Sequence, residues 1–328
     1  MHIHTLAANW HQFLLASAVA SCCMLGGIDA RGLTAAAHAA DLRITQDNST
    51  VSIFDGDRLV LHYRFSGVPM KPYADQLFSP AGVQVLRDAP HDHLHHHGLM
   101  YALAVDGIDF WSEVGQGFGK ELHKSLADVK ATVRNGTGRA GFVEQLDWVG
   151  PASDKPLMVE RRTIDLWRAD DLGATLVGWR CRLQTPPAKE AITLTGHHYF
   201  GLGLRFLQSM DAGGRFFNAD DKPGEIVRGD ERLTAAKWCV YTAKDDGKPV
   251  TAAIFDHPGN VRHPAKMFTM SKPFAYLSAT RNEWKEPLVV KAGKLLELSY
   301  GIALWDGEVD KATVEKLYQR WLKLSGAE

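Results

Sequence analysis

Cysteine is scarce in this sequence, with four residues in 328, and Cys22 and Cys23 lie close to the N-terminus. A scaffold held together by many disulfides is therefore excluded, because too few cysteines remain to build one. The other two, Cys181 and Cys239, each lie in an apolar run typical of a strand. We expect two buried thiols there, with a disulfide between them as the alternative.

Net charge is also nearly absent from the chain. The formal charge is -1 at pH 7, and no run of Lys and Arg forms a basic segment. A general attraction to nucleic acid or to anionic lipid is therefore not expected. Beyond the N-terminal region, no apolar stretch is long enough to span a membrane.

The first forty residues are typical of a signal peptide. Residues 13–19 form a short apolar core, and Ala37-His38-Ala39 supplies a cleavage signal before Asp41. We therefore expect export to the periplasm or the extracellular space. The alternative is a lipid anchor, because residues 19–22 resemble a bacterial lipobox that ends at Cys22.

Signals for helices are rare, whereas strand and turn patterns recur from residue 41 onward. Residues 51–54 and 59–65 alternate around Asp55-Gly56-Asp57, which predicts a hairpin. Regular spacing of such runs predicts one antiparallel β-sandwich domain over residues 41–328. One helix is expected at residues 310–325, capped by Asp310 and with an apolar stripe formed by Val314, Leu317, Tyr318, Trp321 and Leu324.

Histidine is the compositional outlier, with 15 residues in the chain. Five of them lie in one short segment before an apolar strand: His91, His93, His95, His96 and His97. In an extended segment His96 would face away from the other four. Neutral imidazoles are common metal ligands and also suit proton transfer, and Asp92 would serve as a ligand or orient a ring.

Other polar residues at strand ends are further candidates for the site. His197 and His198 are neighbours, so only one of them can face a given site if the segment is a strand. Trp284 lies in a polar loop, where an indole can stack on a sugar ring. Charged residues within strand patterns face either solvent or a cleft. The further group of such candidates contains Lys71, Glu144, Glu160, Arg161 and Arg162, together with the polar Tyr73.

Several motifs, in order along most of the chain, resemble the bacterial "methane oxygenase PmoA-like" family. They are Lys71-Pro72-Tyr73, Asp92-His93-x-His95-His96, the segment at 105–111, Phe200-Gly201 and Asp256-His257-Pro258-x-Asn260. The layout is also similar to the galactose-mutarotase-like supersandwich, whose members act on sugars as epimerases, lyases and hydrolase domains. In those proteins a histidine and a carboxylate perform acid/base chemistry, an analogy at the level of the fold.

The sequence departs from the family pattern at two places. His197-His198-Tyr199 stands where many relatives carry a charged segment, and Met267-Phe268 replaces an aromatic residue followed by histidine. His197 or His198 would then substitute for the missing imidazole, or the activity has diverged.

These features predict an exported enzyme that acts on a small sugar or oligosaccharide by epimerisation, elimination or hydrolysis. Its proton-transfer groups would be His93, His95 and His96, with Asp92 as the orienting residue. Substrate contacts would come from Lys71, Tyr73, Arg205, His257, Asn260 and Trp284.

Two other functions remain open. One is a periplasmic copper- or zinc-binding protein without sugar chemistry. For a metal, with Zn, Cu, Mn or Ca as the ions considered, the expected ligands are His91, His93, His95 and His197. The other is a non-catalytic carbohydrate-binding module that uses Trp111 and Trp284.

Overall fold

The computed structural model describes residues 41–151 and 153–326. The predicted signal peptide and the alternative anchor at Cys22 lie outside these residues. Within them the chain forms three antiparallel sheets, the short 3-10 helix Gln208–Met210 and one α-helix. This architecture confirms the predicted all-β fold with a C-terminal helix. In the described part of the chain, no helix has the length and apolar character needed to cross a bilayer.

The largest sheet has ten strands in the order β1-β2-β3-β4-β5-β13-β20-β19-β16-β15. The predicted hairpin is β2–β3, next to the edge strand β1, and Gly56 turns the chain there with a φ of 61° that favours glycine. The strands are β1 (Leu42–Gln46), β2 (Thr50–Asp55), β3 (Arg58–Arg64), β4 (Tyr73–Leu77), β5 (Leu99–Ala102), β13 (Gly201–Arg205), β15 (Glu225–Arg228), β16 (Glu231–Ala235), β19 (Lys266–Met270) and β20 (Tyr276–Thr280).

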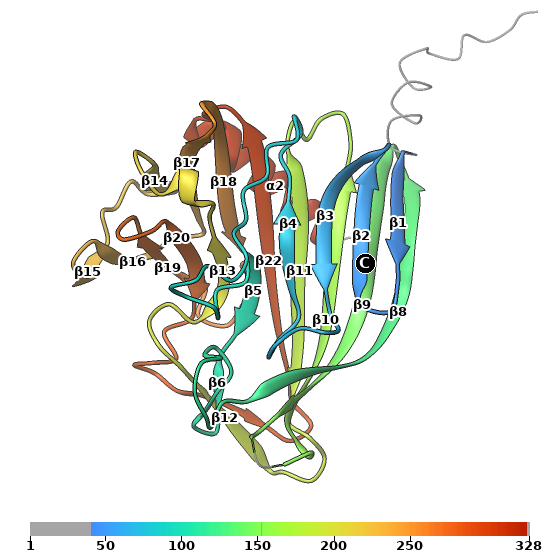
Figure 1. Cartoon of the computed structure of the whole chain (residues 1–328), viewed down its shortest axis with the longest axis vertical. Helices are drawn as coiled ribbons and strands as arrows, with labels where there is room; N and C mark the ends of the chain where they lie inside the picture. The colour runs from blue at the N-terminus through green and yellow to red at the C-terminus, as the bar shows by residue number, and fades with distance from the viewer. Residues whose placement is uncertain (1–40, 152, 327–328) are drawn as a thin grey trace, which may run out of the picture.

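A second sheet of eight strands, most of them longer, lies behind β1 to β5 (Figure 1), in the order β14-β17-β18-β22-β11-β10-β9-β8. Its strands are β8 (Lys120–Arg134), β9 (Thr137–Val149), β10 (Pro156–Arg168), β11 (Thr175–Gln184), β14 (Arg215–Asn218), β17 (Trp238–Asp245), β18 (Lys248–Asp256) and β22 (Leu295–Asp306). A small third sheet joins β21 (Leu288–Lys291), β12 (Ala191–Thr195), β6 (Ala104–Val105) and β7 (Ile108–Asp109).

The main hydrophobic core joins the inner faces of the two large sheets. Val51 and Leu61 belong to one sheet and Phe142 and Trp179 to the other, and all four are buried in a single apolar cluster. This is the sandwich packing expected when one face of each strand is apolar. Cys181 and Cys239 are both buried and unpaired, as expected, and burial raises the pKa of Cys239 to about 12.

A charged network lies inside the sandwich. The Arg162 guanidinium donates to Glu160 at 2.9 Å and to Glu121 at 2.8 Å, and all three side chains are fully buried. Tyr63 donates to Glu144 at 2.5 Å within the same region. The sequence did not say whether these polar side chains face solvent or the protein interior. Glu144, Glu160 and Arg162 face the interior. Arg161 faces outward, because neighbouring residues on a strand point to opposite sides.

The helix α2 (Lys311–Ser325) packs on the outer face of the eight-stranded sheet. Asp310 caps it by accepting a hydrogen bond from the Thr313 amide at 2.8 Å, as predicted. The stripe of Val314, Leu317, Tyr318 and Trp321 is buried against tryptophans and aliphatic residues of β10, β17, β18 and β22.

Candidate functional site

The histidine segment is a folded loop between β4 and β5. Two successive turns form it, with the His93 amide bonded to the Pro90 carbonyl and the His96 amide to the His93 carbonyl, each at 2.9 Å. The Ala89 amide closes the loop on the His96 carbonyl at 2.9 Å. The segment is therefore a loop, one of the two placements that the sequence left open, and the alternation of an extended strand does not apply because the backbone turns twice within eight residues.

Gly98 fixes the end of this loop. Its φ is 52°, and a side chain at this position would place Cβ 2.4 Å from the Ala74 carbonyl oxygen of β4. Glycine alone tolerates both conditions. The turn from the loop into β5 therefore depends on this residue.

Three histidines of the loop gather on one side. The ring centre of His96 lies 4.8 Å from that of His93 and 4.5 Å from that of His95. These rings line a cavity of about 500 Å³ between the loop and the strands β16, β19 and β20. The structure thus brings together the three histidines that the sequence predicted as proton-transfer groups.

The rest of the cavity combines aromatic walls with a polar rim. The aromatic side chains are Tyr199, Phe268, Phe274 and Tyr276, and the charged ones are Arg228, Asp230, Glu231 and Lys272. His96 stacks on Tyr276 with ring centres 5.6 Å apart. A cavity of this size, with aromatic walls and hydrogen-bonding groups at its rim, is typical of a small-molecule site.

The imidazoles of His95 and His96 are neutral at neutral pH. Burial lowers the pKa of His95 to about 4, and the positive charges of Lys71 and His93 add to this effect. Burial also lowers the pKa of His96 to about 2, with help from His95 and His93. Each ring therefore offers one hydrogen-bond acceptor and one donor, so both rings can accept a proton.

Asp92 lies beside this group at the protein surface. Its carboxylate is 3.1 Å from Nδ1 of His93. Burial raises the pKa of Asp92, but the contact with His93, the Asp92 amide and the nearby His91 together outweigh it and leave the pKa below its usual range. The position fits the predicted role of orienting an imidazole.

His97 points to the opposite side of the loop. Its Nδ1 lies 2.6 Å from Asp88 and its Nε2 2.8 Å from Glu113. Tyr73 stacks on the His97 ring at 4.2 Å, and Lys71 binds Glu113 and the Trp111 carbonyl.

The position of Lys71 and Tyr73 corrects the expectation that they face a substrate. Lys71 is fully buried, and its ammonium is held by protein groups. Neither residue lines the cavity. Both instead belong to a layer that supports the loop from behind.

Arg205 also lies behind the cavity wall. It is 1 % exposed, and its guanidinium carbon is 3.9 Å from the ring centre of Phe274. The same guanidinium donates to Asp211 at 3.2 Å and to the Ala275 carbonyl at 3.1 Å. Arg205 therefore positions Phe274. The expected direct contact between Arg205 and a substrate is not supported, because the guanidinium is held behind the cavity wall.

His198 reaches the cavity through a carboxylate. Its Nε2 lies 3.1 Å from Glu231, which lines the cavity, and the Trp284 ring packs against His198 with centres 5.7 Å apart. His197 stacks on Tyr199 at 5.7 Å. Of the predicted substrate residues, Trp284 is therefore one layer away from the cavity.

His257 and Asn260 belong to a turn elsewhere in the molecule. The Asn260 side chain donates to Asp256 at 2.7 Å and accepts from the Ser299 amide at 2.7 Å. His257 packs against Trp321 of α2, with ring centres 5.7 Å apart. The predicted contact of these two residues with a substrate is not supported, because their partners hold them at the base of the helix.

The expected metal ligands do not converge. Among residues 41–151 and 153–326, no three side chains of His, Cys, Asp or Glu are placed to hold one ion. His91 is exposed, whereas His197 packs against aromatic rings. A divalent cation at this site stays a prediction.

Glu231 and the aromatic walls are the part of the site that sequence reasoning missed. Glu231 is 5 % exposed and accepts two hydrogen bonds from Arg228, at 2.6 and 3.2 Å. The only local signal was a charged residue after the Gly229-Asp230 turn, at the start of an otherwise ordinary strand. Nothing in that pattern separates a cavity residue from a surface one.

Comparison with known proteins gives a family without an assigned function. A model described as "Family of unknown function (DUF6807)" matches residues 50–319. No curated protein matches the chain. The comparison lends no support to the methane-oxygenase PmoA-like resemblance, which stays a prediction.

Among solved structures, the chain is similar to two α-galactosidases. The enzyme from Lactobacillus brevis is 7% identical with a TM-score of 0.46, over 86% of this chain and 42% of that one. The enzyme AgaA from Geobacillus stearothermophilus is 10% identical with a TM-score of 0.44, over 81% and 41%. The chain spans less than half the length of either, and likeness at this level carries no functional information.

Proposed function

The chain belongs to a family of unknown function, DUF6807, and we propose that it is an enzyme that acts on a sugar by acid/base chemistry. The cavity beside His93, His95 and His96 is its active site in this proposal. One observation carries it: two neutral imidazoles, His96 buried and His95 half-buried, face an aromatic-walled cavity large enough for a sugar.

The wall composition supports a sugar as the substrate. Sugar rings have apolar C–H faces and a rim of hydroxyls, so they suit a site with aromatic sides and scattered hydrogen-bonding groups. Tyr199, Phe268 and Phe274 supply the aromatic sides. Neutral imidazoles and the carboxylate of Glu231 supply acceptors and donors for hydroxyls.

Proton abstraction is the chemistry that these residues support best. His95 is the more basic of these two rings, with a pKa of about 4 against about 2 for His96, so His95 is the general base. His96 then holds a substrate hydroxyl or carbonyl oxygen. Glu231 is the carboxylate on the same cavity, and His198 and Arg228 fix its position.

Epimerisation or β-elimination therefore fits better than hydrolysis. Glycoside hydrolysis commonly needs two carboxyl groups on opposite sides of the scissile bond. The two carboxylates of this cavity, Asp230 and Glu231, are neighbours in sequence, and Asp230 is bound to the amide and hydroxyl of Ser271 at 2.9 and 2.6 Å.

A sugar panel tests the proposal. Protein without a histidine tag is incubated with monosaccharides and disaccharides, and the products are followed by NMR, which distinguishes epimerised, eliminated and hydrolysed sugars. We expect turnover by the wild type and its loss in His95→Ala and His96→Ala. The matched control is His91→Ala, an exposed histidine of the same loop. Full activity in both cavity variants would contradict the proposal.

The same protein distinguishes the alternative functions. A metal-binding protein would retain copper or zinc in elemental analysis and show no turnover. A non-catalytic module would bind glycans after loss of the histidines. The tryptophans named for that module do not favour it, because Trp111 is 1 % exposed and stacks on Phe200 at 4.9 Å.

Export belongs to the proposal as well. The N-terminal features described above support a signal peptide that ends before Asp41. Mass spectrometry of protein recovered from cell fractions separates the outcomes. A periplasmic or secreted form that starts at Asp41 is expected, whereas a membrane-bound form with lipid on Cys22 would support the anchor. An intact N-terminus in the cytoplasm would contradict export.

A further inference from the structure

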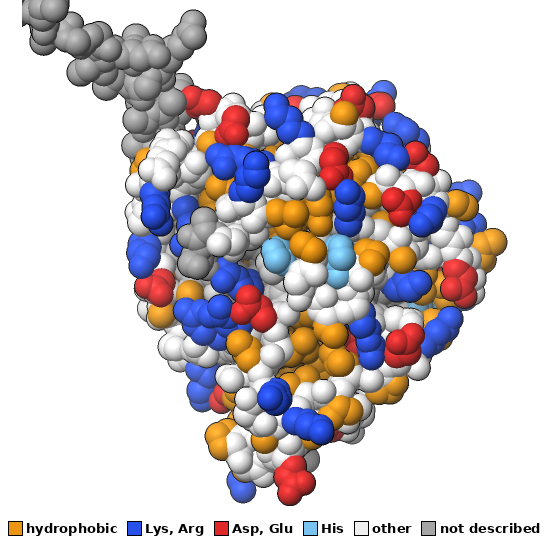
Figure 2. Space-filling view, turned by 180° about the vertical axis from the view of Figure 1, so that it is seen from behind, with side chains coloured by type: hydrophobic (Ala, Val, Ile, Leu, Met, Phe, Trp, Pro, Cys, Tyr) orange, Lys and Arg blue, Asp and Glu red, His pale blue; other side chains and the backbone are white. Residues whose placement is uncertain are grey.

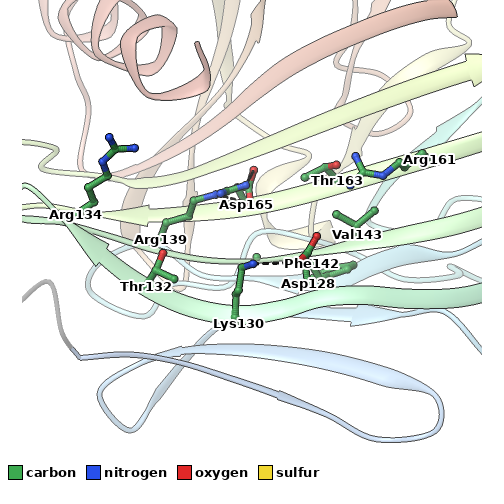
Figure 3. Close-up of a pocket in the computed structure, with 11 residues that line it drawn as sticks. Asp128, Lys130, Thr132, Arg134, Arg139, Phe142, Val143, Arg161, Thr163 and Asp165 are labelled. Atoms are coloured by element: carbon green, nitrogen blue, oxygen red, sulfur yellow. Dashed lines mark hydrogen bonds and ion pairs between the residues drawn. The ribbon is translucent and has the colours of Figure 1, made fainter. Parts of the chain in front are cut away.

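A basic groove lies on the outer face of the eight-stranded sheet. It has a volume of about 390 Å³ and is formed by β8, β9 and β10 (Figure 3). The cations on it are Lys130, Arg134, Arg139 and Arg161, against two acidic side chains, Asp128 and Asp165. The chain as a whole has a net charge of -1, so this positive excess is local.

The position of α2 explains why the groove is open. The helix covers the part of this face that carries Leu176, Trp238 and Trp305 with an apolar cluster. The face around β8 and β9 has no such cover. In the view from behind (Figure 2), Lys and Arg side chains are spread over both halves of the face, several of them close together on the left, with acidic side chains among them.

A neighbouring hollow extends the groove toward the helix. Its volume is about 530 Å³, and it shares Lys130, Arg134 and Arg139 with the groove. Arg320 and Lys323 of α2 line its far side. The two hollows together form a continuous basic channel that a chain-like ligand can follow.

The cations of the groove differ in whether they form ion pairs with other described residues, although Arg161 lies near enough to Asp128 to add to the effect of Lys130 in lowering the pKa of that carboxyl. Arg139 is bound to Asp165 at 2.9 and 3.0 Å, and Lys130 to Asp128 at 3.0 Å. Arg134 and Arg161, by contrast, form no ion pair within the part of the chain that the structure describes. Arg161 lies directly opposite Arg182 on β11, and Arg182 is paired with Glu297 at 2.6 Å.

We propose that this channel binds a segment of an acidic polysaccharide. Guanidinium groups match carboxylates and sulfates through paired hydrogen bonds, and several of them in a row suit a ligand with a charge on successive sugars. Thr132 and Thr163 add hydroxyl groups that can form hydrogen bonds with the uncharged hydroxyls of such a ligand. Single-stranded nucleic acid fits less well, because the aromatic rings on the channel, Phe142 and Trp167, are buried and offer no stacking platform.

The site is distinct from the histidine cavity. The channel belongs to β8, β9, β10 and α2, whereas the cavity is formed by strands of the ten-stranded sheet and the loop before β5. Figure 1 places β8 and β15 at opposite sides of the molecule. The channel therefore does not depend on the reaction proposed above.

Polygalacturonate and heparin are the probes that test it, with dextran as the neutral control. Binding is measured by affinity electrophoresis and by titration calorimetry at low and at high salt. We expect binding of the two acidic chains that weakens with salt and no binding of dextran. In Arg134→Glu/Arg161→Glu, affinity for the acidic chains falls about tenfold or more. The milder Arg134→Gln/Arg161→Gln provides a second variant.

The control has the same charge change at the other edge of the sheet. Arg215→Glu/Lys222→Glu alters two exposed cations, one on β14 and one just after it, and is expected to bind like the wild type, as is His95→Ala. An equal loss of affinity in this control would show that the effect comes from the net charge of the protein and not from the channel, and it would overturn the proposal. Unchanged binding in both groove variants would do so too, and so would tighter binding of a single-stranded oligonucleotide or of phosphatidylglycerol vesicles.

Discussion

Nδ1 of His97 lies 2.6 Å from a carboxylate oxygen of Asp88, on the side of the loop that faces away from the cavity. The other ring nitrogen is 2.8 Å from Glu113, whose carboxylate is 5 % exposed. One imidazole therefore bridges two acids behind the three histidines of the proposed site. This bridge ties the loop to the protein, and it separates the supporting role of His97 from the chemical role of its neighbours.

Loss of this bridge should destabilise the protein. In His97→Gln the buried Glu113 loses one of its two cationic partners and keeps Lys71, so the lost charged hydrogen bonds should cost about 1.5–3 kcal/mol of unfolding free energy. Urea unfolding at neutral pH measures the difference. The exposed His91→Gln is the control and should unfold like the wild type. Equal stability of the two variants would show that the bridge has little energetic weight.

The bridge also predicts a pH dependence of stability. Burial lowers the pKa of His97, but hydrogen bonds to Asp88 and Glu113 outweigh it and raise the pKa above 6.5. The stabilisation is fully present below the unfolded pKa and is lost as pH rises through the folded pKa. The wild type should therefore lose unfolding free energy as pH increases above 6.5. Urea unfolding of His97→Gln over the same pH range should lack this decrease.

The acidic limb of the activity profile should report His95. A free histidine would lose its base form near pH 6.5, whereas burial lowers the pKa of His95 to about 4. With His95 as the base, kcat/KM should rise with pH through about 4 and level off well below neutrality. A limb near 6.5 that persists in His95→Ala would point to another group.

Glu231 offers a test of the carboxylate in the cavity. Glu231→Gln keeps the shape of the side chain but removes its charge, so we expect kcat/KM to fall about 100-fold as for the loss of an acid/base group. Stability should change by less than about 1 kcal/mol, because Arg228 is largely exposed. Glu286→Gln, at a carboxylate that is 63% exposed, is the matched control. Wild-type kinetics in Glu231→Gln would remove this residue from the chemistry.

The cap of α2 gives a prediction that is independent of function. Asp310→Ala removes the acceptor of the Thr313 amide, which costs about 1 kcal/mol. Thermal unfolding followed by circular dichroism should show a lower Tm than in the wild type. Glu308→Ala, two residues earlier and exposed, should leave Tm unchanged. An unchanged Tm in both variants would mean that the packed stripe alone fixes the helix.

The sequence predicted those parts of the fold that depend on local patterns. Alternating residues around Gly56 gave the first hairpin, and the apolar stripe from Val314 to Trp321 gave the helix. The order of the strands was beyond reach, because β5 pairs with β13 across about a hundred residues of chain. Such pairing is set by packing between distant segments rather than by local preference.

The same limit applies to the site. The histidine loop could be predicted because its five histidines lie close together in the sequence. Its partners could not, because Tyr199, Glu231 and Phe274 come from separate segments and look ordinary in each. The basic channel was missed for the same reason: Lys130, Arg139 and Arg161 lie on three neighbouring strands and form no run in the sequence.

The main-chain bond between Ala89 and His96 turns the histidine loop into a closed ring of fixed circumference. Side chains on such a ring are held at set angles, so an inserted or deleted residue would rotate some imidazoles out of the cavity even if every histidine were kept. The length of this segment is therefore as much a part of the site as its composition. Redesign of the site therefore has to substitute side chains without changing the length or the backbone of the histidine loop.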